Sequence, residues 1–267
     1  RLAAGLATAT TLVFVAAGPA FAAEATTSPP RHIIDQSLGA SYNSLGLQHS
    51  LGLRWTWPLT HSRAPLLEGA HASVGVSHAL TPSHMRVTSW VELAPLTVLG
   101  LRAGVEPIAY FGTFGSLRSY DTYTRDFRRG YADGQPVPVT PAAAYRAFLA
   151  SSFQFRVGQL ALASTAGLEW WHADVTGPFF YEPYRDTLLR ASGDRLLTVS
   201  TLLVRQLPRR GGGQLSYGLS HELMDVFQAP RNRSQRLGLV VARRLASRSA
   251  GQQGPTVALR VAYYTEH

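Results

Sequence analysis

The stretch that decides the fold is Ala144–His172, AYRAFLASSFQFRVGQLALASTAGLEWWH. In its first half, every second residue from Tyr145 to Val157 belongs to one mostly apolar series, and the residues between them are mostly small, polar or charged. The second half alternates in the same way. Because successive side chains of a β-strand point to opposite faces, this period of two predicts two strands. Gly158-Gln159 between them predicts a tight hairpin.

Both predicted strands are long enough to cross a lipid bilayer, which takes about 9–11 residues in a tilted strand. One face of each strand is apolar with aromatic residues, and the other face is mostly polar or small. A barrel in a membrane needs this arrangement, with lipid outside and a polar interior. The sequence therefore predicts an all-β fold, a transmembrane antiparallel up-and-down β-barrel.

The same alternation continues on both sides of this hairpin and predicts about ten strands. They are expected near residues 45–57, 70–79, 84–93, 97–111, 144–157, 160–172, 195–206, 214–224, 236–245 and 256–264. Residues 195–206 are too apolar for their two faces to be told apart. Two stretches without an apolar period, 112–143 and 173–194, predict long loops at one end of the barrel.

The beginning of the chain differs from the rest in composition. Residues 1–22 have the features of a secretory signal peptide, with Arg1 first, an apolar segment through Val15 and an A-x-A site ending at Ala22. Residues 23–44 are expected to be a polar linker with a short first strand near Ile33–Ala40. Residues 45–267 are expected to form the barrel.

The number of strands determines where the chain ends lie. With ten strands and both long loops outside the membrane, both chain ends would also lie outside, which a single-chain barrel with an even strand number should not do. An extra strand near Ile33–Ala40 and a final strand beyond His267 would bring the full-length protein to twelve. They would also move both chain ends to the side opposite the long loops.

The alternation, the strand-end pair Trp55 and Trp57 and the predicted leader resemble those of bacterial outer-membrane β-barrel proteins. The resemblance covers roughly residues 45–264 and concerns the architecture, not one member; it leaves the oligomeric state open. It implies a place in the outer membrane of a Gram-negative bacterium, insertion by the barrel assembly machinery, and contact with outer-membrane lipids and lipopolysaccharide. Such barrels commonly end on an aromatic residue, whereas this chain ends Thr265-Glu266-His267.

Composition agrees with a membrane protein more than with a soluble one. The chain has 267 residues, and its 15% charged residues fall below the roughly 25% of soluble domains. The net charge is +9 and every basic residue is arginine, whose guanidinium binds phosphate and carboxylate bidentately. These arginines are scattered over strands and loops, so nucleic-acid binding is not expected. The lack of cysteine excludes disulfides and thiolate metal sites.

Charged residues recur on the polar faces of the predicted strands, where they would face the barrel lumen. They are Arg54, Arg86, Glu92, Arg102, Glu106, Arg146, Arg156, Glu169, Glu222 and Arg260. Ionised groups in a narrow lumen must be paired or hydrated. They predict either a salt-bridge network that fills a structural barrel or a narrow pore in which the arginine excess favours anions. Open aqueous channels occur at about 16–18 strands, so any pore here is expected to be narrow.

The alternatives to a pore or structural barrel are a surface adhesion or binding barrel and an outer-membrane lipid-modifying enzyme, such as a lipid hydrolase. An enzyme is not expected, because the best catalytic candidate, Ser220-His221-Glu222 with Asp225, lies on a predicted strand. There His221 points to lipid while Ser220 and Glu222 point inward. No cofactor or metal site is expected, since the nine histidines lack metal-binding spacing.

The predicted loop 112–143 interleaves aromatic residues with arginines. Its candidates for ligand binding are Tyr123, Arg125, Arg128, Arg129 and Tyr131. Such side chains stack on sugars and hydrogen-bond to phosphates, which lipopolysaccharide head groups supply. The alternative is a loop that folds over the barrel mouth. Both interpretations put this loop on the same side as residues 173–194.

Overall fold

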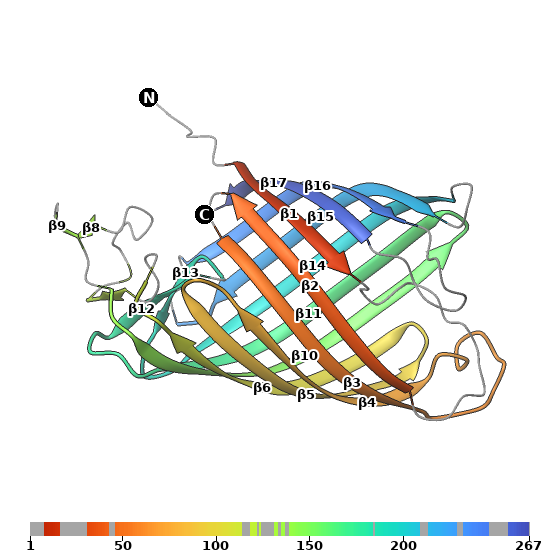
Figure 1. Cartoon of the computed structure of the whole chain (residues 1–267), viewed down its shortest axis with the longest axis horizontal. Helices are drawn as coiled ribbons and strands as arrows, with labels where there is room; N and C mark the ends of the chain where they lie inside the picture. Colours follow the sequence, from red (N-terminus) through yellow and green to blue (C-terminus); the bar gives the residue numbers. More distant parts are fainter. Residues whose placement is uncertain are drawn as a thin grey trace.

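The structure, a computed structural model, describes residues 8–16, 31–42, 46–113, 118–121, 123, 131–132, 135–136, 139–183, 185–208, 213–228, 232–245 and 256–266. Twelve antiparallel strands close into one barrel (Figure 1), in the order β1-β17-β16-β15-β14-β11-β10-β6-β5-β4-β3-β2. The predicted all-β, up-and-down barrel is therefore confirmed.

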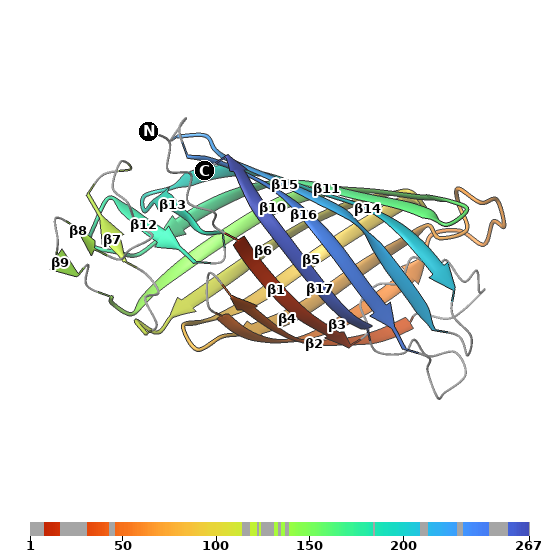
Figure 2. The same cartoon turned by 90° about the horizontal axis from the view of Figure 1, so that it is seen from above.

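The barrel strands are β1 (Thr8–Ala16), β2 (Arg31–Tyr42), β3 (Gly46–Pro58), β4 (His71–Leu80), β5 (His84–Leu96), β6 (Leu99–Tyr110), β10 (Ala142–Val157), β11 (Leu160–Ala173), β14 (Asp194–Pro208), β15 (Gln214–Val226), β16 (Arg233–Arg244) and β17 (Thr256–Glu266). Five short strands form two small sheets: β7 (Ser119–Tyr120), β8 (Tyr131–Ala132), β9 (Gln135–Pro136), β12 (Phe179–Glu182) and β13 (Thr187–Arg190). Both small sheets lie at one end of the barrel (Figure 2).

Alternation along the strands puts large apolar side chains on the outer wall. On β10, the outward-facing Leu149 and Phe153 are 50% and 44% exposed, whereas Arg146 on the inner face is 9% exposed. The β10–β11 hairpin turns at Gly158, whose φ of 58° suits glycine. An apolar outer wall around closed, fully paired strands is what a bilayer requires. Among the described residues, no helix is long and apolar enough to cross a membrane.

The barrel closes through β1, which pairs with β17 on one side and β2 on the other. The short strand expected near Ile33–Ala40 is β2. The twelfth place, however, belongs to Thr8–Ala16, inside the predicted signal peptide of residues 1–22, and not to a strand beyond His267. The segment TATTLVFVA is apolar and rich in β-branched residues, so it fits a strand as well as a leader. Removal of residues 1–22 is incompatible with this pairing and stays a prediction.

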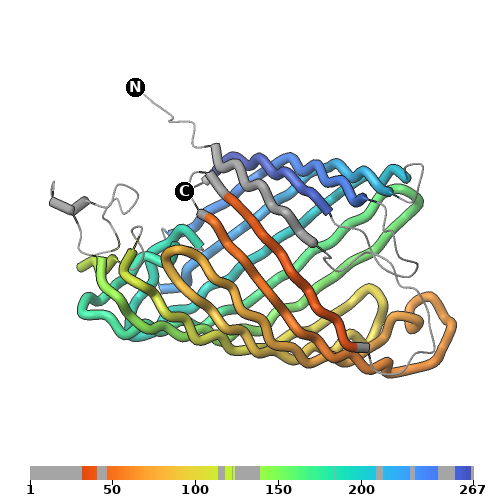
Figure 3. Tube along the Cα trace, viewed as in Figure 1, coloured from red at the N-terminus to blue at the C-terminus, as the bar shows by residue number. Residues whose placement is uncertain are grey.

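Both long connections, 111–141 and 174–193, lie at the same end of the barrel. Strand β7 from the first pairs with β12 from the second. The sequence predicts that the two loops lie on the same side, and this pairing agrees with it. Strand β17 finishes at this end too (Figure 3), and β1 starts there (Figure 1). The expectation that the chain ends lie opposite the long loops is therefore wrong, because the twelfth strand comes before β2 and not after β17.

Candidate functional site

The β12–β13 hairpin, residues 179–190, enters the barrel mouth at the long-loop end, and we call it the plug hairpin. Its Phe180, Leu188 and Leu189 are fully buried. Phe180 and Leu189 pack against inward-facing side chains of four barrel strands. These are Ile108 and Tyr110 on β6, Trp171 on β11, Leu196 on β14, and Met224 and Val226 on β15. The apolar contacts fix the plug hairpin inside the lumen.

Two carboxylates tie the plug hairpin to opposite walls. The hydroxyl of Tyr110 on β6 donates to Glu182 Oε1 at 3.2 Å. On the other wall, the hydroxyl of Tyr264 on β17 donates to Asp186 Oδ2 at 2.7 Å, and Arg236 NH2 lies 3.7 Å from the same oxygen. Strands β6 and β17 are six places apart in the ring of twelve, so they face each other across the lumen. The plug hairpin therefore spans the barrel.

The turn of the plug hairpin is held by its own polar groups. Asp186 has a φ of 53°, in the left-handed region that aspartate tolerates better than most residues. Its Oδ1 accepts a hydrogen bond from the Tyr181 hydroxyl at 2.7 Å. Glu182 Oε2 accepts a hydrogen bond from the backbone N–H of Arg185 at 2.5 Å. These contacts aim Arg185 toward the β11 wall.

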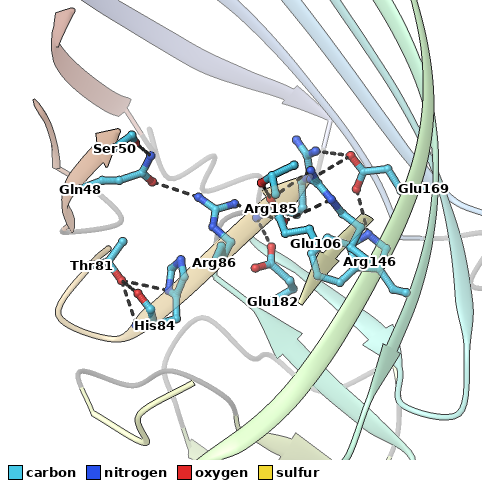
Figure 4. Close-up of polar contacts among 12 residues, drawn as sticks. Gln48, Ser50, Thr81, His84, Arg86, Glu106, Arg146, Glu169, Glu182 and Arg185 are labelled. Carbon is cyan, nitrogen blue, oxygen red and sulfur yellow. Dashed lines mark hydrogen bonds and ion pairs between the residues drawn. The ribbon is translucent and has the colours of Figure 1, made fainter. Parts of the chain in front are cut away.

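A chain of ion pairs lines the lumen below the plug hairpin (Figure 4). Arg146 Nε lies 3.3 Å from Glu106 Oε1, and its NH1 donates to Glu169 Oε1 at 3.4 Å. Glu169 also contacts Arg185 of the plug hairpin. At the other end of the chain, Arg86 NH1 lies 4.0 Å from Glu106 Oε1. We call these five residues the ion-pair network.

Charge balance makes burial of this network tolerable. The side chains of Arg86, Glu106 and Glu169 are 5% exposed, and that of Arg146 is 10% exposed. Isolated charges at such depth would be strongly destabilising, but paired and hydrogen-bonded ones are not. With Glu182 included, three arginines face three glutamates, so the assembly is neutral. Trp171 Nε1 also donates to Glu169 Oε2 at 2.8 Å.

A second charged group lies on the opposite wall. Glu222 on β15 pairs with Arg260 on β17 at 2.5 Å and with Arg236 on β16 at 4.0 Å. Arg260 Nε donates to Ser220 Oγ at 3.0 Å. Arg236 also contacts Asp186 of the plug hairpin. The plug hairpin is therefore held on one side by this charged group and on the other by the ion-pair network.

The lumen beyond the ion-pair network, toward the short turns, is open to solvent, and we call this part the vestibule. Its inward-facing residues Ser152, Gln154, Thr165 and Ser200 are exposed. At the long-loop end, by contrast, most inward-facing residues, from Ile108 to Val226, are buried. The lumen is therefore filled by side chains at the long-loop end and exposed to solvent toward the opposite end.

The structure divides the ten predicted lumen charges into four groups. Arg86, Glu106, Arg146 and Glu169 meet in the ion-pair network, and Glu222 meets Arg260. Glu92 meets Arg102, whose Nε donates to Glu92 Oε2 at 2.7 Å. The remaining two residues belong to none of these ion-pair groups. Arg156 is exposed at the short-turn end, where its Nε donates to Gly158 O at 2.9 Å, and Arg54 faces the vestibule.

Of the predicted loop candidates, Tyr123 is the one whose side-chain contacts can be followed. Its ring lies 4.1 Å from that of Phe179, and its hydroxyl donates to Asp194 Oδ2 at 2.6 Å. Burial first, and then the Asp194 carboxylate, raise the pKa of Tyr123. Tyr131 lies in β8. Arg125, Arg128 and Arg129 lie outside the described residues. Tyr123 thus covers the plug hairpin, as the alternative of a loop folded over the mouth expects.

The predicted catalytic candidate is not assembled. His221 Nε2 lies 2.8 Å from Gln235 Nε2 on the outer wall, while Ser220 is buried on the inner wall beside Arg260. No group of three His, Asp or Glu side chains suited to a metal ion occurs in the described part of the chain.

The residues that sequence reasoning missed are those of the plug hairpin, chiefly Glu182, Arg185 and Asp186. Their sequence, FFYEPYRDTLLR, holds two apolar runs around a Pro-containing turn, which is a hairpin signal. The segment was expected to be a connection, and nothing in the pattern shows that the hairpin folds inward.

No protein-family model and no curated protein matches this chain. Among solved structures, it is similar to the beta domain of the Bordetella autotransporter BrkA, with 12% identity, a TM-score of 0.44, and 97% of this chain and 99% of that chain covered. It is also similar to a loop L8 deletion mutant of OmpT, an outer membrane protein of Vibrio cholerae, with 7% identity, a TM-score of 0.31 and the same coverages. Neither likeness is close enough to carry an argument about function.

Proposed function

We propose that this protein is a narrow outer-membrane channel for small solutes whose long-loop mouth is closed by the plug hairpin in the state described. The observation that carries the proposal is the contrast inside the lumen. The solvent-exposed vestibule ends at the buried plug hairpin and ion-pair network. Hydrogen bonds and ion pairs join the plug hairpin to both walls of the barrel. The apolar outer wall supports a place in a membrane, and strands, not helices, span the outer membrane of Gram-negative bacteria.

The polar contacts that hold the plug hairpin in the mouth favour a channel that can open and close over a permanently open pore. The ties at Glu182 and Asp186 are a few polar contacts, each worth roughly 1–3 kcal/mol where a charged group takes part. Polar contacts of this size can be broken at modest cost, and the apolar contacts of the buried Phe180, Leu188 and Leu189 hold the plug hairpin in addition to them. The competing function is a structural barrel in which the same contacts only stabilise the fold. Lipid modification and surface adhesion have no further support in the geometry.

Planar-bilayer conductance tests the channel. Wild-type protein should show little or no conductance. The double variant Glu182→Gln, Asp186→Asn loses both carboxylates that tie the plug hairpin to the walls, so it should show discrete conductance steps. Asp174→Asn changes an exposed loop carboxylate and serves as the matched control, which should stay silent.

Folding of each variant is checked by heat-modifiable migration on a gel. If the double variant is folded but as silent as wild type, the channel proposal is wrong and the structural barrel stands. Wild-type protein that already conducts as strongly as the double variant would show that the plug hairpin does not close the lumen.

A further inference from the structure

Four polar side chains form a row across the outer wall of the barrel, on the neighbouring strands β11, β14, β15 and β16. Ser164 Oγ lies 3.0 Å from Thr201 Oγ1. Thr201 is the register partner of His221, and His221 Nε2 lies 2.8 Å from Gln235 Nε2. All four stand at outward positions of the alternation, in series with exposed apolar residues such as Leu203. We call these four residues the polar stripe.

The polar stripe reaches the middle of the apolar wall. On β14, Arg195 and Arg205 are exposed at outward positions, and they mark the two ends of the apolar band, because charged side chains on a lipid face are tolerated near the interfaces. Ten residues along β14 separate them, which is about 33 Å along the strand and roughly 25 Å along the barrel axis at a tilt of about 40°. Thr201 lies between these arginines, and His221 faces Thr201 on β15. Both side chains therefore lie at the depth of lipid hydrocarbon.

The polar stripe has hydrogen-bonding capacity that the barrel itself does not use. Within the described part of the chain, each of its four side chains makes one hydrogen bond, to its neighbour in the stripe. When the Gln235 amide donates to His221 Nε2, the imidazole proton lies on Nδ1, where it has no acceptor. One hydroxyl of the Ser164–Thr201 pair likewise keeps its hydrogen unused. Lipid chains offer these groups no partner, so their exposure to lipid is unfavourable.

The depth of the polar stripe determines what can cover it. Lipid head groups lie about 15 Å from the middle of the hydrocarbon region, so their phosphates and sugars do not reach Thr201. A partner must therefore be a protein that presents polar side chains at the same depth of its own lipid-facing wall. A second copy of this chain does so, because a two-fold axis along the membrane normal places equal residues of both copies at equal depth.

We infer that two copies of this chain associate in the membrane through the polar stripe, with the two-fold axis beside Thr201 and His221. The stripe crosses the wall obliquely, from the middle of β14 to Gln235, the third residue of β16 from the long-loop end. The two-fold axis gives the stripe of the second copy the opposite slope, so the two stripes cross at their centres. Imidazole and hydroxyl donors of one copy then meet hydroxyl and amide oxygens of the other, as Ser, Thr, Gln and His do between transmembrane helices.

Small side chains beside the polar stripe allow the two walls to approach closely. Ser151 on β10 and Ala166 on β11 are register partners at outward positions, and both are exposed. Small residues of this kind are enriched where transmembrane segments pack against each other. The association does not depend on whether the plug hairpin opens, so it stands or falls separately from the proposed channel.

Cysteine cross-linking in native outer membranes tests the contact, because the chain contains no cysteine of its own. Oxidation of Thr201→Cys should give a disulfide-linked species of twice the chain mass on a non-reducing gel. Leu53→Cys is the matched control, since Leu53 is 40% exposed near the middle of β3, six places from β14 in the ring of twelve. It should stay monomeric. Equal cross-linking at both positions, none at Thr201→Cys, or a cross-link from Thr201→Cys to a different protein overturns the inference.

The double variant Thr201→Val, His221→Leu tests the polar groups themselves. Energy transfer between donor-labelled and acceptor-labelled full chains in lipid vesicles should show association weakened by roughly tenfold or more relative to wild type. In detergent, the midpoint temperature of heat-modifiable migration should not fall, because neither side chain contacts the lumen. His49→Leu replaces an imidazole of the outer wall near the long-loop end of β3 and should leave association unchanged.

Thr201→Val alone keeps the shape of the side chain and should weaken association in the same direction, so it decides the question if the double variant does not fold. Undiminished association in a folded variant of the polar stripe shows that the copies do not meet there. An equal loss in His49→Leu shows that polar groups of the outer wall act without regard to position. Either result overturns the inference.

Discussion

At the scale of single residues, Glu169 holds the ion-pair network together, because Arg146, Arg185 and Trp171 all converge on it. Glu169→Ala leaves Arg146 in a dry environment with less compensating charge, and we expect a loss of about 3–5 kcal/mol of stability. The midpoint temperature of heat-modifiable migration measures it. Asp174→Ala, an exposed carboxylate, should cost less than about 0.5 kcal/mol. Similar shifts for the two variants would contradict a structural role of the network.

Tyr123 makes the cover of the plug hairpin sensitive to alkaline pH. Its folded-state pKa is raised, so the stability from its hydrogen bond to Asp194 is fully present below about pH 10, the pKa of unfolded tyrosine, and is lost as the pH rises further. At pH 8, the free energy of unfolding of wild type should exceed that of Tyr123→Phe by about 1 kcal/mol. That advantage should shrink above pH 10, as measured by thermal midpoints. A constant difference up to pH 11 would contradict this assignment.

At the scale of elements, the contact between β14 and β15 depends on Gly218. A Cβ there would lie 1.9 Å from Leu203 O and 2.7 Å from Val204 Cα, so Gly218→Ala must push the two strands apart. We expect a loss of about 1–3 kcal/mol, or no folded band at all. Gly39 on β2 has nothing within 4 Å of its ideal Cβ, so Gly39→Ala is the matched control and should stay within about 0.5 kcal/mol.

Strand faces could be predicted from sequence wherever one face meets lipid and the other meets water or charge. On β10, Leu149 points out and Arg146 points in, as the alternation predicts. Strand β14 gives no such pattern, because its outward Leu203 meets lipid while its inward Leu196 meets the apolar plug hairpin. Both faces are therefore apolar for different reasons. The position of the plug hairpin depends on contacts far apart in sequence, such as Asp186 with Tyr264, which alternation does not encode.

At the scale of the whole molecule, β1 decides whether the barrel is closed. The intact mass of heat-modifiable protein from outer membranes decides between this pairing and the predicted removal of residues 1–22, because a barrel that keeps Thr8–Ala16 paired on both sides must retain them. A mature chain that starts at Ala23 would remove β1 from the ring. It would confirm the predicted signal peptide and leave one edge each of β2 and β17 unpaired.

Orientation in the membrane follows from the unequal ends of the barrel. Long loops of such barrels face outward and short turns face the periplasm, so we expect the plug hairpin and both chain ends at the cell surface. Protease added to intact cells should cut at Arg125, Arg128 or Arg129, and an antibody should reach a C-terminal tag. Cleavage and binding only after the outer membrane is breached would reverse this orientation.

The plug hairpin also has a mechanical consequence, because it joins strands that face each other across the ring. A thin-walled tube under sideways pressure first becomes oval, and a brace across its diameter resists that deformation. Tyr110–Glu182 at one end and Tyr264–Asp186 at the other make the hairpin such a brace. A change in the lateral pressure of the bilayer can flatten the barrel cross-section along this diameter. Such a change would act first on these two contacts, so the surrounding lipid would exert a force on the closed mouth.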